Sequence, residues 1–166
     1  VNKSSLPKVY GGFNTSLSWK GFDLSAIFAY SIGGYIYNRD ITMILHNGSL
    51  EGRDWSTEIL KRWTPDNRNT DVPALSTTTN NWNSASTRFL QNNSYMRLKN
   101  LTLSYNLPKQ WISKLSLSSV QVYVQGDNLF TIHQNQGLDP EQGINGINYY
   151  RYPAMRTISG GINVSF

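Results

Sequence analysis

Five long stretches of the chain alternate between apolar and polar residues, and this period of two limits the fold more than any other feature. They span residues 9–19, 22–32, 94–107, 120–130 and 156–166. In the third stretch, Leu101, Leu103 and Tyr105 alternate with Thr102 and Ser104. Successive side chains of a strand point to opposite faces, so this spacing predicts β-strands with one apolar and one polar face. The sequence therefore indicates an all-β fold.

The length of these stretches bears on what surrounds the apolar face. Strands of water-soluble folds average about 5–6 residues, whereas tilted membrane-spanning strands need about 9–11. Aromatic residues near the strand ends can sit at the level of lipid head groups; these are Tyr10, Trp19, Phe22, Tyr30, Tyr95, Phe130 and Phe166. The pattern favours strands of an outer-membrane barrel. A soluble sandwich with cross-strand aromatic pairs is the alternative.

The connections between the stretches follow a regular order. Lys20 and Gly21 alone link the first two stretches, residues 108–119 link the third and fourth, and residues 33–93 and 131–155 form long connections. In an antiparallel up-and-down meander this order places both long connections on one rim, as in barrels with long outer loops and short periplasmic turns. Within the first long connection, residues 54–63 predict a short helix capped by Asp54.

The composition excludes several classes of function. Cysteine is absent, and His46 and His133 lack the spacing of a metal site. The sequence also lacks a nucleophile motif and a phosphate-binding glycine loop, so it predicts no enzyme and no cofactor or metal site. The net charge is +5, but the 15 Lys and Arg residues are scattered and form no cluster along one element, which argues against a nucleic-acid partner. No apolar run approaches the roughly 20 residues of a membrane-spanning helix.

Five strands are too few to close a membrane barrel, which needs at least about eight. An open sheet edge in lipid leaves backbone groups unpaired, at a cost of several kcal/mol each. If these strands cross a membrane, they must therefore be part of a larger wall. The chain begins at Val1, which fits a mature protein as well as a piece of a longer one.

Several motifs, taken together and in order, resemble one family. They are the segments 62–67 (RWTPDN), 70–73 (TDVP), 94–105 (SYMRLKNLTLSY), 122–130 (VYVQGDNLF), 137–141 (GLDPE) and 152–153 (YP) before 156–157 (RT). They are similar to the C-terminal region of the SusC/RagA-type TonB-linked outer-membrane transporters. The similarity covers nearly the whole chain.

This resemblance implies a 22-stranded barrel with an N-terminal plug, of which the chain supplies the last five strands. Such a transporter imports oligosaccharides, peptides or similar nutrients across the outer membrane. The resemblance also implies that the TonB complex acts through N-terminal parts outside this chain, and that a SusD-like surface lipoprotein serves as a lid. The connections 33–93 and 131–155 are then extracellular.

Candidate binding residues lie in the long connections. Aromatic faces stack on sugar or peptide and Arg binds carboxylates, so we expect Tyr149, Tyr150, Arg151 and Tyr152 to contact substrate or the lid. Packing against a neighbouring loop is an equal alternative. Weaker candidates are Trp63, Trp82 and His133. Asp139 and Glu141 flank Pro140, and their simplest interpretation is a turn.

The end of the chain has a pattern of its own. Ile162, Val164 and Phe166 resemble the C-terminal signal that the outer-membrane assembly machinery reads, with alternating apolar side chains and a final aromatic residue. A plain last strand is the simpler alternative. For the whole chain, the competing function is a soluble all-β carbohydrate-binding module whose exposed aromatic residues stack on glycan. A chain that stays monomeric without detergent and binds glycan would support that module.

Overall fold

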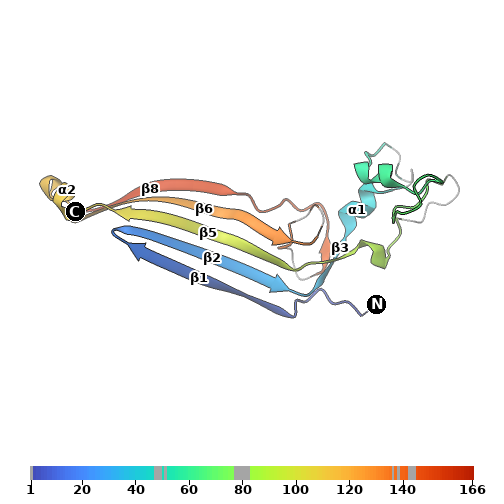
Figure 1. The fold of residues 1–166 in the computed structure, drawn as a ribbon, viewed down its shortest axis with the longest axis horizontal. Coiled ribbons are helices and arrows are strands. Elements are labelled where there is room, and N and C mark those ends of the chain that lie inside the picture. The colour runs from blue at the N-terminus through green and yellow to red at the C-terminus, as the bar shows by residue number, and fades with distance from the viewer. Residues whose placement is uncertain are drawn as a thin grey trace.

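The computed structural model describes residues 2–46, 50, 52–76, 83–135, 137, 139–141 and 145–166 (Figure 1). Its main feature is one antiparallel sheet of five long strands in the order β1-β2-β5-β6-β8. The strands are β1 (Val9–Trp19), β2 (Phe22–Ile32), β5 (Tyr95–Asn106), β6 (Ser119–His133) and β8 (Thr157–Ser165). Each long strand pairs with the next long strand along the chain, so the expected antiparallel meander is confirmed.

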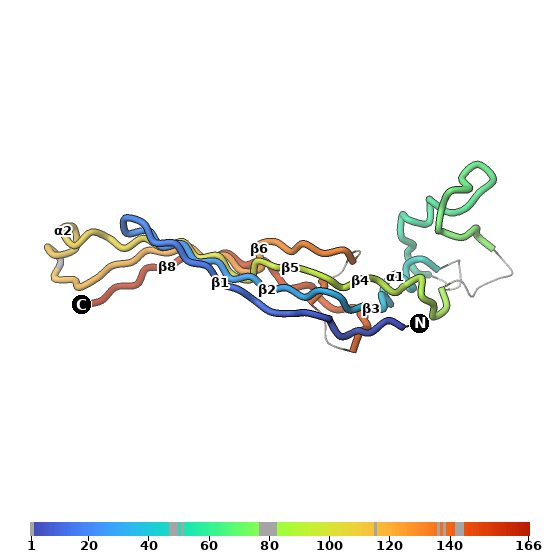
Figure 2. Tube along the Cα trace, turned by 60° about the horizontal axis from the view of Figure 1, so that its bottom comes forward, coloured from blue at the N-terminus to red at the C-terminus, as the bar shows by residue number. Residues whose placement is uncertain are grey.

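The sheet is a single layer. In Figure 2 the five strands overlap into one thin band, with α1 (Arg39–Ile44) near one end and α2 (Lys109–Ile112) near the other. The turn between β1 and β2 consists of Lys20 and Gly21, both with positive φ. Two consecutive residues of positive φ form the type I′ turn that matches the twist of a hairpin. None of the helices in the described ranges is long and apolar enough to cross a membrane.

A bulge interrupts the regular alternation of β5 and β6. The register of β5 slips between Leu98 and Asn100 against β6, and β2 shows the same slip. In β6, Asn128 takes a left-handed backbone with φ of 52° beside this slip. An inserted residue changes which face the following side chains point to. As a result Leu98 shares the face of Leu101, while Arg97 shares the face of Asn100.

The bulge also explains where the sequence-based bounds differ. We expected the fourth strand to end at Phe130 and its connection to begin at residue 131, but β6 continues to His133 and pairs with β5 as far as Tyr95. The apolar alternation stops at Asn128 because the bulge lies there, and the ladder resumes beyond it. The third and fifth stretches, expected at 94–107 and 156–166, are slightly shorter in the structure.

The long connections carry elements that the alternation did not predict. A second sheet in the order β4-β3-β7 joins β3 (Tyr35–Asn38), β4 (Leu90–Asn92) and β7 (Ile147–Asn148), and β3 runs parallel to β7. The expected short helix at 54–63 is present, but it is shorter than expected and Asp54 does not cap it. The structure has a 3-10 helix, η1 (Thr57–Lys61), whose N-cap is Ser56. Ser56 accepts a hydrogen bond from Glu58 N, which satisfies a free donor of the first turn.

Most of the buried side chains lie in these connections rather than in the long sheet. We call the described parts of residues 33–94 and 134–156 the loop region. Its largest fully buried side chains are Phe89, Ile36, His46, Asn38, Asn148 and Pro140. Phe89 is the last residue of the 3-10 helix η2 (Thr87–Phe89) and packs edge-on against Tyr37, with ring centroids 6.2 Å apart. The loop region therefore holds a core of its own at one end of the sheet.

Candidate functional site

One face of the long sheet is lined by apolar side chains that continue across all five strands. One row joins Trp19, Phe22, Tyr105, Val122 and Ile162, and the next joins Leu17, Leu24, Leu103, Val124 and Gly160. We call this side the apolar face. Because the sheet is a single layer, these side chains stay uncovered, and Leu17 is 68% and Ile162 64% exposed. A soluble sandwich would cover such a face with a second sheet.

The opposite side, the polar face, carries rows of hydrogen-bonding side chains. One row joins Ser16, Ser25, Thr102, Gln125 and Ser159. Neighbouring rows are bonded across strands. Asn100 Nδ2 donates to Asp127 Oδ1 at 2.8 Å, and Asn106 Nδ2 donates to Asp23 Oδ2 at 2.8 Å. The sheet thus separates an apolar side from a polar side, as the alternation predicted.

The aromatic residues near the strand ends divide between these two faces. Trp19 and Phe22 lie in a row of the apolar face, and Tyr30 points to the same side. Tyr10 and Tyr95 were also expected near the lipid head groups, but they do not lie on the apolar face, so this expectation is wrong. Both pair with Ser31 on the polar face. For Tyr95 the cause is the bulge at residue 99, which reverses the alternation of β5.

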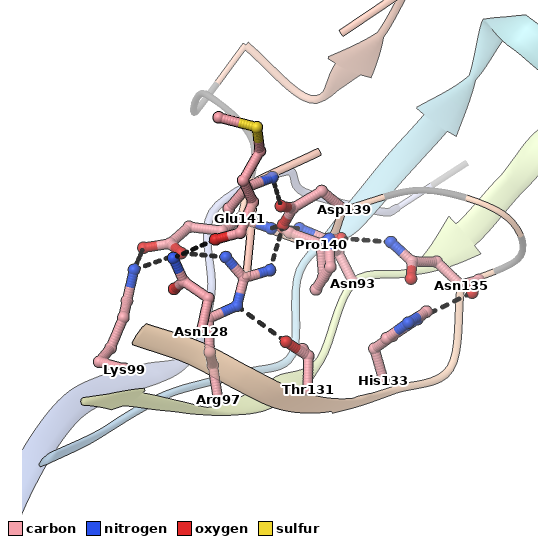
Figure 3. Close-up of polar contacts among 12 residues, drawn as sticks. Asn93, Arg97, Lys99, Asn128, Thr131, His133, Asn135, Asp139, Pro140 and Glu141 are labelled. Carbon is pink, nitrogen blue, oxygen red and sulfur yellow. Dashed lines mark hydrogen bonds and ion pairs between the residues drawn. The ribbon is translucent and has the colours of Figure 1, made fainter. Parts of the chain in front are cut away.

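A cluster of four charged residues lies on the polar face where the sheet meets the loop region (Figure 3). The ion cluster consists of Arg97, Lys99, Asp139 and Glu141. Arg97 forms ion pairs with Asp139 and, at 2.8 Å, with Glu141, and its Nε donates to Thr131 at 2.9 Å. The side chain of Arg97 is 4% exposed. A buried charge needs partners of opposite charge, because removing such a partner leaves an uncompensated charge in the interior.

The segment 139–141 is held by the ion cluster and by its surroundings. Asp139 accepts hydrogen bonds from Ala154 N at 2.7 Å and Glu141 N at 2.9 Å. Burial alone would raise the pKa of Asp139, but the bonds from Ala154, Arg97 and Glu141 outweigh it and hold this pKa below its usual value. Asp139 and Glu141 therefore do more than flank a turn, since they fasten the last connection to the sheet.

The more exposed half of the ion cluster is Lys99 with Glu141. Lys99 Nζ lies 2.6 Å from Glu141 Oε1, and the two side chains are 33% and 36% exposed. The register slip places Lys99 at the bulge itself, next to Arg97 on the same strand. Sequence reasoning missed Arg97. Its only signal was a cation at a position that the uninterrupted alternation assigned to the apolar side.

Four expected binding residues lie close together in the chain, and two of them make defined contacts. The rings of Tyr149 and Tyr150 are 4.5 Å apart, and Arg39 lies over Tyr149 at 4.4 Å. Tyr150 N donates to Asp40 at 2.9 Å, and Arg53 donates to the Tyr150 hydroxyl at 3.2 Å. These contacts join the last connection to the first. They match the loop-packing alternative while leaving Tyr150 61% exposed.

The remaining predicted residues are dispersed. Arg151 and Tyr152 are exposed, Tyr152 to 87%. Trp63 follows η1, is 43% exposed, and donates its backbone N–H to Val72 at 2.8 Å. His133 ends β6 with Nδ1 3.0 Å from Asn135 O. Trp82 lies outside the described residues.

The C-terminal residues sit at the edge of the sheet, at the end away from the loop region (Figure 1). Ile162 and Val164 pair with Val122 and Val120 on the apolar face, and Phe166 follows β8 with 91% of its surface exposed. Within the described residues, β8 pairs only with β6 and β1 only with β2. Both outer strands thus present backbone groups without a partner strand.

Metal-ligating side chains do not gather anywhere in the part of the chain that the structure describes. No group of three or more His, Asp or Glu residues there is placed to hold a metal ion. The ion cluster has two carboxylates, but Arg97 and Lys99 already pair with them. Its chemistry is that of a structural clamp.

Comparisons with known proteins find relatives along the whole chain, although no protein-family model matches it. TonB-dependent receptor P3 of Formosa agariphila is 35% identical over 166 residues, which cover 93% of this chain and 16% of the receptor. TonB-dependent receptor SusC of Bacteroides thetaiotaomicron is 26% identical over 100% of the chain and 16% of the receptor. The chain thus spans about a sixth of the length of these relatives.

Solved structures give the same result for the fold. The chain is similar to part of the RagAB peptide importer in its closed-closed and open-open states, each with a TM-score of 0.87 and 35% identity. Both matches cover 100% of this chain and 18% of the larger one. By sequence and by fold, the chain belongs to the SusC/RagA-type TonB-dependent receptors and corresponds to the C-terminal part of their β-barrel.

Proposed function

We propose that this chain forms five strands of the wall of an outer-membrane transporter that imports oligosaccharides, peptides or similar nutrients. The observation that carries the proposal is the single-layer sheet with continuous apolar rows on one face and hydrogen-bonded polar rows on the other. Lipid chains cover the first face and the water-filled lumen hydrates the second. The outer edges of β1 and β8 pair with strands of the remaining barrel, because unpaired edges are too costly in lipid.

In this arrangement the loop region lies outside the cell and the turn at Lys20 and Gly21 lies in the periplasm. A SusD-like surface lipoprotein covers the outer end, and Tyr149, Tyr150, Arg151 and Tyr152 contact it or the substrate there. The TonB complex acts through a plug and N-terminal segments outside this chain. Support for a partner at the outer end comes from the RagAB importer, which is known in closed-closed and open-open states.

Transport is tested in cells that carry the full-length gene. Deleting it should abolish uptake of a fluorescent oligosaccharide or peptide that the parent strain imports, and a plasmid copy should restore uptake. Removing TonB should have the same effect as the deletion, because import across the outer membrane has no other energy source in this proposal. Uptake that persists in either deletion strain for every imported probe would refute the transport role.

Assembly into the membrane is the second test. We expect deletion of Phe166 from the full-length protein to lower the amount of folded barrel in outer-membrane fractions, because the assembly machinery reads the apolar side chains and aromatic end of β8. Folded barrel is scored by its heat-dependent shift on gels. Phe166→Trp keeps an aromatic end and is the matched control. An unchanged yield after the deletion would leave Ile162, Val164 and Phe166 as a plain last strand.

A further inference from the structure

Two tyrosines stand on the polar face with a single small residue between them. Tyr10 of β1 pairs with Ser31 of β2, and Ser31 pairs with Tyr95 of β5. Directly paired residues in adjacent strands point to the same face. Tyr10 is 77% exposed and Tyr95 is half-buried, so at least one ring is freely available.

The separation of these tyrosines suits a ring between them. Adjacent strands lie about 4.8 Å apart, so Tyr10 and Tyr95, two strands apart, are attached about 10 Å from one another. A ring in contact with aromatic planes on both sides needs roughly 7–8 Å between those planes, because carbon atoms in contact lie about 3.5–4.0 Å apart. A small residue at position 31 keeps this space open. The next row supplies Gly12 and Ala29, which are small as well.

A cavity of about 300 Å³ occupies this place. Tyr10, Ala29, Ser31 and Tyr95 line it from the sheet, and Asn93 and Pro140 line it from the loop region. Its volume is at the lower end of the range for small-molecule sites. Part of its wall is fixed, because Asn93 donates to Pro140 O at 2.9 Å and the ion cluster clamps both neighbours of Pro140 (Figure 3).

The lining indicates the chemical class of the ligand. All residues that line this cavity are uncharged, and they include three tyrosines, Tyr10, Tyr30 and Tyr95, beside hydroxyl, amide and backbone groups. Arg97, in the next row, is already paired with Asp139 and Glu141. A neutral sugar ring satisfies this lining, because its C–H face stacks on an aromatic ring while its hydroxyls form hydrogen bonds. No charged side chain lines this cavity, so its wall offers the charged end of a peptide no opposite charge.

We propose that Tyr10 and Tyr95 form a binding subsite for one neutral pyranose ring of an oligosaccharide, on the lumen side at the outer end of the wall. This inference rests on the proposed transport function and narrows it to a sugar substrate. Ser31 sets the width of the subsite, and Pro140 closes it from the loop region.

The test uses the full-length protein purified in lipid nanodiscs and titrated calorimetrically with neutral hexasaccharides of glucose, xylose, mannose and galactose. We expect at least one to bind, and Tyr10→Ala and Tyr95→Ala each to weaken it about three- to tenfold. Ser31→Phe fills the space between the rings and should abolish binding. Ser25→Phe is the matched control, since it makes the same change on the same strand and face but outside the cavity.

Each outcome decides the matter once gel shifts show that the variants are folded. Loss of binding in Ser31→Phe but not in Ser25→Phe supports the subsite. Equal affinity of the wild type and Ser31→Phe refutes it, as does failure of all four sugars to bind. Ring-dependent binding of a neutral peptide instead of sugar would overturn the ligand class. A sugar that binds through these tyrosines but is not imported would contradict transport while leaving the subsite intact.

Discussion

The long sheet and the loop region differ in how their apolar side chains are covered. In the sheet, Leu17, Leu103 and Ile162 are 68%, 42% and 64% exposed, although each strand pairs with its neighbours in the sheet. In the loop region, Ile36 and Phe89 are each 1% exposed. The sheet therefore depends on its surroundings to cover its apolar side chains, whereas the loop region buries its own. Substitutions that affect one region more than the other can test this contrast.

The largest effect is expected from Arg97→Met in the full-length protein. The change leaves the Asp139 carboxylate buried without its cation, which costs about 3–5 kcal/mol when a buried ion pair is broken. Amide hydrogen exchange should speed up at Asp139, Glu141 and Ala154, which the cluster holds, more than in the middle of β5. Measured by mass spectrometry, equal acceleration throughout the sheet would contradict a clamp that acts on the loop region.

The matched variant for this prediction is Lys99→Met. Lys99 and Glu141 are each about a third exposed, and exposed ion pairs contribute only about 0–1 kcal/mol. We therefore expect Lys99→Met to change the hydrogen-exchange rates of the loop region very little. A loss as large as that of Arg97→Met would show that the two halves of the ion cluster act as one unit.

The next largest effect concerns the apolar face. Lysine on the lipid side of a barrel costs about 2–4 kcal/mol at the middle of the bilayer, so Leu103→Lys should lower the free energy of unfolding in lipid vesicles by up to that amount. Thr102→Lys places the same charge one residue away on the polar face and should change it far less. Similar losses in both variants would mean that the apolar face does not meet lipid.

A smaller effect follows from pH. The pKa of Asp139 is lowered in the folded chain, so its stabilisation is complete above the usual pKa of about 3.9 and is lost as pH falls through the folded value. The loop region should therefore loosen below about pH 4, as measured by exchange rates at matched temperature. Asp139→Asn should remove this acid-dependent step. If the loop region of that variant still loosened at low pH, the effect would come from another carboxylate.

The smallest effect is expected on the exposed surface of the loop region. Arg39→Ala removes a cation over the ring of Tyr149, a contact worth about 0.5–1 kcal/mol at exposed sites. Stability should change by no more than this, and pull-down assays with the proposed lipoprotein partner report whether the surface around Arg39 and Tyr149 is used for binding. A loss of several kcal/mol would place Tyr149 in the core instead.

The sequence was a good guide to the sheet because its signal is local. Alternation predicted the long strands and their meander order, and the residues 9–19 and 22–32 coincide with β1 and β2. It failed at the bulge, because an inserted residue such as Lys99 leaves no mark in the composition but reverses every side chain beyond it. For that reason Tyr95 was expected near the lipid head groups, and Arg97 was not recognised as a residue of the polar face.

The loop region was much less predictable, since its structure depends on contacts between distant residues. The pairing of β3 with β7 joins residues more than a hundred positions apart. Likewise, Arg97 and Asp139 each look ordinary in the sequence and gain their role only when the last connection folds back on the sheet. The N-cap of η1 is Ser56 and not the expected Asp54, which lies two residues earlier. The ends of short helices are therefore only weakly specified by the sequence.

The parallel pair of β3 and β7 has a mechanical consequence. Tyr37 N donates to Gly146 O at 2.7 Å, and Asn148 donates to Asp40 at 3.0 Å, so the two long connections are bonded to one another. A displacement of either connection must then move the other connection as well. A force applied to one connection is therefore passed on to the strands at the ends of both connections.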